Sequence, residues 1–214
     1  MTHFTSLSVF QGAVRTALAS LAFEVRYGAV ESRRWDSPTL YLADDGCGNR
    51  GAIQFAGHDC IGVCFIKELP TIDIVSKLTN IPVSLRSEVE SLADLQFFVS
   101  SQHSSRITSV FWSIEGKIDD SNPSKEDMVK TGDELFSFEF LSPALWKSRA
   151  AEGYELPQCT LDAIFDISTS TNKPGSLVRL SAENLEFIFP REFGDRKSAL
   201  DNLLGGGAFS FEST

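Results

Sequence analysis

Residues 134–141 read ELFSFEFL, and the fold expected for the second half of the chain rests on this stretch. Phe136, Phe138 and Phe140 alternate with polar residues, among them Glu139. A period of two places the three rings on one face of a β-strand and the polar side chains on the other. The pattern therefore predicts a sheet strand that buries its phenylalanine side.

Further runs are typical of strands, and turn residues separate them. Around the phenylalanine run these are residues 107–114, 161–167 and 185–189. In the first half, strands are predicted at residues 39–43, 52–56 and 60–66, the last two as a hairpin. We expect an α+β fold, with a mostly antiparallel sheet in two meander-like halves and helices packed on it.

In the first half, helices are predicted from apolar residues at helical spacing and from capping residues. Residues 9–25 carry an apolar stripe that ends at Gly28, which predicts a helix with one face on the sheet. Thr71 is the expected N-cap of a short helix over residues 72–79. A capping box that begins at Ser87 predicts a longer helix up to about residue 101.

In the second half, Ser142 as N-cap, Pro143 at the first helical position and Gly153 past the end predict a short helix. A turn is expected at residues 172–175, which read NKPG. The end of the chain, residues 205–214, is expected to be a loosely held tail.

A length of 214 residues suits one domain, since single domains run to roughly 200 residues or more. We predict a single α+β domain over residues 1–214, with 1–116 and 117–214 as the alternative pair of subdomains. With 42% hydrophobic and 22% charged residues, the composition is that of an ordinary globular protein, neither disordered nor fibrous.

The four cysteines are expected to be free thiols, because the chain is long and has no convincing signal peptide. They are Cys47, Cys60, Cys64 and Cys159. A bilayer span needs about 20 predominantly apolar residues, and no such run is found. The sequence thus favours a soluble protein of the reducing cytoplasm that makes no membrane contact.

The chain is acidic, with 19 Lys and Arg residues, 29 Asp and Glu residues and a formal net charge of -10. Nucleic-acid binding depends on clustered cations, so a nucleic-acid partner is not expected. Up to Gly116 there are nine basic and twelve acidic residues, a net charge of -3; from Lys117 onward there are ten and seventeen, a net charge of -7. Electrostatic attraction should therefore originate mostly in the second half and favour a basic protein partner.

Gly46, Gly48 and Gly51 have the G-x-G-x-x-G spacing that dinucleotide-binding folds and protein kinases use. A dinucleotide site needs a helix after the third glycine, whereas a strand is predicted here. A glycine-rich hairpin turn explains the same residues without a ligand.

A kinase-like arrangement would pair a strand lysine with a helix glutamate beside the glycine loop. Lys67 and either Glu88 or Glu90 stand in the required order, but no HRD-type catalytic loop is present. An enzyme is the alternative class. It would be a hydrolase or transferase with its site near residues 46–58, or a degenerate kinase-like fold.

His58, Cys60 and Cys64 are metal-ligand types at close spacing. On one strand, the α-carbons of the two cysteines stand about 13 Å apart at ~3.3 Å per residue, whereas thiolates sharing a zinc have sulfurs within ~4 Å. We predict buried, unreactive thiols and neither a metal nor a cofactor. A nucleophile–base pair of Cys47 with His58 or His103 has no spacing that brings its members together.

Residues 117–132 are polar and are predicted to form a long exposed loop. The segment lacks the ligand alternation of an EF-hand calcium loop. Two interpretations stay open, a solvated loop and a protein-docking surface. In the second case the binding residues are the carboxylates Asp119, Asp120, Glu126, Asp127, Asp133 and Glu134.

The phenylalanine run leads straight into Ser142-Pro143-Ala144-Leu145, and a later run ends in Phe187-Ile188-Phe189-Pro190 before a final helix. This arrangement resembles a pattern found in small acidic immunity proteins of bacterial toxin systems. The resemblance implies a cytoplasmic, non-catalytic α+β protein that neutralises a cognate toxin by plugging its active site. We therefore expect a non-enzymatic binding protein, in its sharpest form an immunity protein with a basic toxin as partner.

Overall fold

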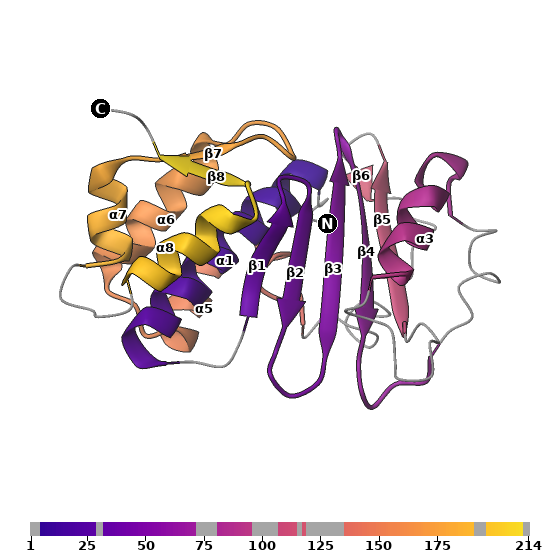
Figure 1. Cartoon of the computed structure of the whole chain (residues 1–214), viewed down its shortest axis with the longest axis horizontal. Helices are drawn as coiled ribbons and strands as arrows, with labels where there is room; N and C mark the ends of the chain where they lie inside the picture. Colours follow the sequence, from indigo (N-terminus) through magenta and orange to yellow (C-terminus); the bar gives the residue numbers. More distant parts are fainter. Residues whose placement is uncertain are drawn as a thin grey trace.

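A computed structural model describes residues 5–28, 32–71, 81–95, 107–114, 117–118, 135–190 and 196–211. Its larger sheet has six strands that lie side by side in chain order (Figure 1): β1 (Ser32–Ser37), β2 (Leu40–Asp44), β3 (Arg50–Ala56), β4 (Asp59–Phe65), β5 (Ser109–Ile114) and β6 (Lys117–Ile118). All five pairings in this sheet are antiparallel. A small second sheet pairs β7 (Val178–Leu180) with β8 (Phe209–Phe211) in parallel.

The described helices are α1 (Ser6–Tyr27), the short 3-10 helix η2 (Val83–Leu85), α3 (Arg86–Ala93), α5 (Pro143–Gly153), α6 (Gln158–Ser170), α7 (Ala182–Ile188) and α8 (Arg196–Gly205). Together with the sheets they form the α+β fold that the sequence predicts. None of the helices in the described ranges is both long enough and apolar enough to cross a membrane.

The first-half strand predictions are confirmed, including the hairpin of β3 and β4, whose register runs from Arg50 opposite Phe65 to Ala56 opposite Asp59. Strand β1 was not predicted, because its sequence SRRWDS is mostly polar. Trp35 and Arg33 nevertheless alternate with exposed residues on this strand and are buried. β1 is thus an edge strand that is apolar at one position only.

The sheet is buried on both faces, and α1 and α3 cover opposite ones. In Figure 1, α3 lies in front of β4 and β5, and α1 passes behind β1 and β2. Side chains on the α3 face form one hydrophobic cluster, which includes Ile61, Val63 and Val89. Those on the α1 face form a larger cluster, which joins residues from both halves of the chain.

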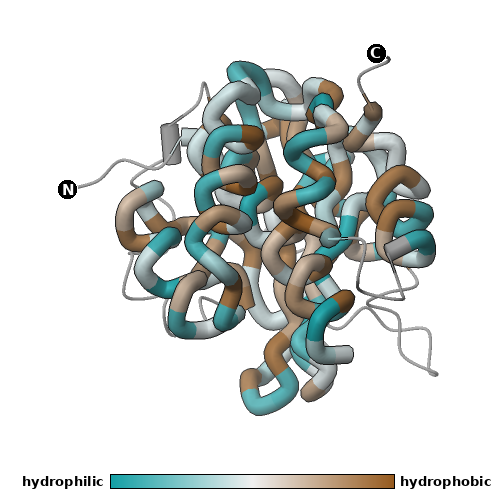
Figure 2. Tube along the Cα trace, turned by 90° about the vertical axis from the view of Figure 1, so that its left-hand side faces the viewer, coloured by the Kyte–Doolittle hydropathy of each residue, from teal (hydrophilic) through white to brown (hydrophobic). Residues whose placement is uncertain are grey.

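Helix α1 is the centre of the helical part. A Thr5 capping box starts it, and Gly28 ends it in the left-handed conformation at φ 68°, as the sequence predicts. Every residue from Gly12 to Ala22 is buried. The prediction of a single buried face is therefore wrong: the helices beyond β1 enclose α1 on the sides that the sheet leaves open. Figure 2, which views the helical part, shows hydrophilic and hydrophobic residues alternating along the helices.

The predicted strand at 134–141 is wrong, because residues 135–140 form consecutive turns. The amide of Phe140 donates to the carbonyl of Phe136, so these two rings lie on one side and are buried. Phe138 is half-buried on the other side, 5.2 Å from the ring of Tyr154. Residues four apart share one side of a helical turn, so the aromatic spacing that suggests a strand fits this turn as well.

Close approach to two glycines holds this turn segment in the core. The backbone of Glu139 lies against Gly12 of α1, and the ring of Phe136 lies against Gly51 of β3. A Cβ atom at either glycine would collide with these groups. Packing against α1 and the sheet thus decides the conformation in place of the local alternation.

The predicted strands at 161–167 and 185–189 are also wrong, since α6 and α7 occupy these residues. In α6 the buried residues follow a helical period: Thr160, Leu161, Ala163, Ile164, Ile167 and Ser168. A capping box of Ser181 and Asn184 starts α7. The helical spacing of α6 and the capping box of α7 are both present in the sequence. They were not recognised because short apolar runs fit a strand and a helix alike.

The helix from Pro143 is confirmed, although Ser142 makes no side-chain capping bond and Gly153 is the last helical residue. The Ser87 capping box is wrong: the helix begins at Arg86, and the Ser87 hydroxyl donates to Glu88. That helix ends at Ala93, short of the expected residue 101. The short helix expected over residues 72–79 lies outside the described residues.

The expected loose tail is wrong for the described residues 205–211. Ala208 and Phe209 are buried, and β8 pairs with β7. Gly206 touches the backbone carbonyl of Trp35 so closely that a side chain there would collide with it. The end of α8 is therefore packed against the edge strand β1.

Candidate functional site

The residues predicted to form a docking surface all lie outside the described residues: Asp119, Asp120, Glu126, Asp127, Asp133 and Glu134. The described residues on either side of them are Ile118 of β6 and Leu135, which is buried in the α1-face cluster. The docking surface therefore stays a prediction.

The Gly46–Gly51 loop is a self-bonded hairpin turn. The carboxylate of Asp45 accepts hydrogen bonds from the backbone N–H groups of Cys47 and Asn49, at 2.8 and 3.0 Å. The side-chain oxygen of Asn49 accepts from the backbone N–H of Lys67 at 2.9 Å. Gly46 and Gly48 have positive φ values of 70° and 109°, a region that favours glycine. The glycines thus serve the turn, as the hairpin interpretation predicts.

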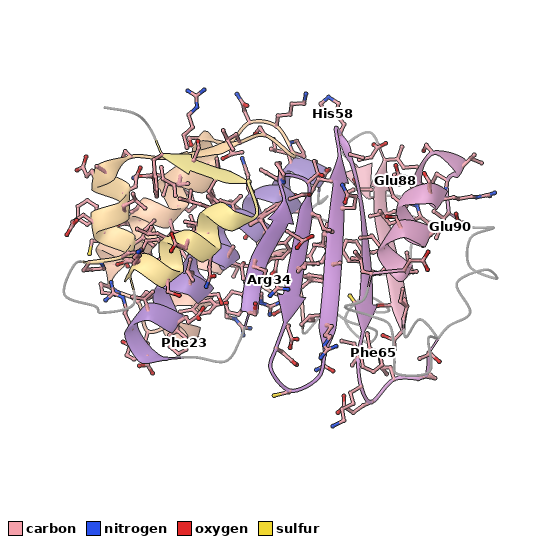
Figure 3. The ribbon with its side chains drawn as sticks, in the orientation of Figure 1. Phe23, Arg34, His58, Phe65, Glu88 and Glu90 are labelled. Atoms are coloured by element: carbon pink, nitrogen blue, oxygen red, sulfur yellow. The ribbon has the colours of Figure 1, made fainter. Side chains whose placement is uncertain are left out.

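The kinase-like arrangement does not assemble. Glu88 and Glu90 lie at the upper right of Figure 3, on α3. Phe65, two residues before Lys67, lies at the lower end of β4 in the same view. The lysine end of the strand and the two glutamates are therefore not brought together.

The thiols on β4 are buried, as predicted: Cys60 is 1% and Cys64 2% exposed. Burial raises the pKa of the Cys60 thiol to about 12, which keeps it protonated and unreactive at neutral pH. Cys47 and His58 occupy the turns at opposite ends of the seven-residue strand β3. About 20 Å of strand separates them, so they form no dyad. His103 lies outside the described residues.

Within the described ranges, no three His, Cys, Asp or Glu residues gather closely enough to hold a metal ion. Among the described residues, the titratable groups with large pKa shifts are Arg15, Tyr41 and Cys60, and all three are in the interior. Such shifts can mark functional sites or structural interactions. Here each group is packed in the core.

A buried ionic cluster links the turn segment to the sheet. The Tyr41 hydroxyl donates to Glu139 Oε1 at 2.7 Å, and Arg33 Nη1 lies 3.8 Å from the same oxygen. All three residues are buried. Burial and the Glu139 charge raise the pKa of Tyr41 well above its usual value, so its hydroxyl remains a donor. Ninety-eight positions separate Tyr41 from Glu139 along the chain, and no motif in the sequence connects them.

A second buried charge, Arg15, lies inside the helical part. Its guanidinium group is 5.6 Å from the ring of Trp146 and donates a 3.4 Å hydrogen bond to Ser168. Burial lowers the Arg15 pKa to about 10. In the sequence, this position lies within an ordinary helical pattern, so the burial of its charge was not predicted.

A cleft of about 200 Å³ opens between α1, β1 and α8. Its polar lining includes Ser20 and Glu24 of α1, Arg33 and Arg34 of β1, and Asn202 of α8. Figure 3 shows Arg34 on β1, where the sheet meets the helical part. This cleft was not predicted from the sequence, because its three walls come from distant segments and one of them, β1, was not predicted.

Comparisons of the chain with protein-family models, with curated proteins and with solved structures found no match.

Proposed function

We propose that this chain is a non-enzymatic binding protein of the cytoplasm whose acidic surface docks a basic protein, and that in its sharpest form it is an immunity protein for a toxin. The observation that carries the proposal is the distribution of charge. The part from Lys117 onward has a net charge of -7, and six carboxylates fall within residues 119–134. The pattern that resembles small acidic immunity proteins included strands at residues 134–141 and 185–189, where the structure has turns and α7, so the immunity form of the proposal rests on the charge.

Helix α3 exposes acidic side chains of its own. Glu90 and Asp94 are exposed and Glu88 is half-buried, while Val89 and Leu92 face the core. Charged side chains of one sign accelerate the association of an oppositely charged protein over about a Debye length, ~8 Å at physiological salt. They change the association rate more than the stability of the fold.

The experiment is a pull-down from the native host, followed by association kinetics with the captured partner over a salt series. Asp119→Lys with Asp120→Lys should slow association and flatten its dependence on salt. The matched control is Glu152→Lys with Asp166→Lys, an equal charge reversal at exposed positions of α5 and α6, which should have a smaller effect. Equal association rates and equal salt dependence for the wild type and the first variant would contradict the proposed docking surface.

The immunity form of the proposal has its own test. Co-expression of this chain with a captured toxin should restore the growth of cells that the toxin arrests. If the captured partner is not toxic, or if co-expression leaves growth arrested, the immunity function is wrong even where binding is genuine.

A further inference from the structure

We draw no further inference here: the strongest candidate, the partly exposed row of aromatic rings formed by Tyr27 and Phe23 at the end of α1 with Tyr154 and Phe138 beside them, carries nothing because nothing in the structure shows what covers it.

Discussion

On the sheet face that meets α3, the buried side chains are apolar, among them Leu42, Ala52, Ile61, Val63 and Trp112. On the face that meets α1, aromatic rings surround a buried carboxylate, Glu139, with Tyr41 and Arg33 beside it. The same six strands supply both faces. An apolar face is stabilised by area and packing alone, whereas a buried charge is tolerated only with partners in place. The α1 face is thus expected to be the less tolerant of substitution.

The largest expected effect is on the α1 face. Glu139→Ala removes the acceptor of the Tyr41 hydroxyl and the carboxylate beside Arg33. Breaking a buried pair from one side costs about 3–5 kcal/mol, and urea unfolding measures this loss. Glu139→Gln keeps the shape and an acceptor oxygen, so it should be less destabilising. A loss below about 1 kcal/mol in the alanine variant would mean that the cluster does not stabilise the fold.

On the α3 face, Ile61→Ala should lower the free energy of unfolding by about 3 kcal/mol, through lost burial and the cavity left behind. Ile61 is 0% exposed, so little relaxation of its surroundings is expected. Ile61→Val is the graded control and should cost about 1 kcal/mol. Equal losses in the two variants would contradict a tightly packed apolar face.

The turn segment at residues 135–140 belongs to the α1 face of the sheet, to which it contributes both Glu139 and the phenylalanine rings. The full burial of Phe138 predicted from the sequence is wrong, because the ring is half-buried. Phe138→Ala should therefore cost about 1–2 kcal/mol, less than the 3–5 kcal/mol of a fully buried ring. Phe136→Ala removes a ring that is 1% exposed and should cost at least twice as much. A thermal melt compares the two, and a reversed order would contradict the turn.

The smallest effect is a dependence on pH that arises on the α1 face. The folded-state pKa of Cys60 is raised to about 12. Its contribution to stability is therefore complete below the ordinary thiol value of about 9 and is lost as the pH rises toward 12. Between pH 8 and 10 the loss should be about 1 kcal/mol.

Cys60→Ala should flatten this part of the stability curve. Val63→Ala, on the α3 face of the same strand, introduces no change in titration and should lower stability equally at both pH values. Parallel curves for the wild type and Cys60→Ala would show that the thiol does not contribute.

Much of the first half could be predicted from the sequence, since its structure follows from local patterns. Gly28 ends α1 because its left-handed backbone suits a residue without a side chain. The turn at Asp45 and Gly46 joins two strands because the aspartate bonds to its own loop. Burial of Cys60 also follows, because an apolar run between two turns makes a strand that both faces of the sheet cover.

The second half needed the tertiary structure. The residues of α6 and α7 fit strand and helix equally well over short windows, and only packing against α1 decides between them. The phenylalanine spacing at 136–140 likewise suits a strand or a helical turn, and Gly12 and Gly51 leave room for the turn. The Arg33–Tyr41–Glu139 cluster and the cleft beside Arg34 join segments far apart in the chain. No local pattern encodes such contacts, because they form only when the helices close over the edge of the sheet.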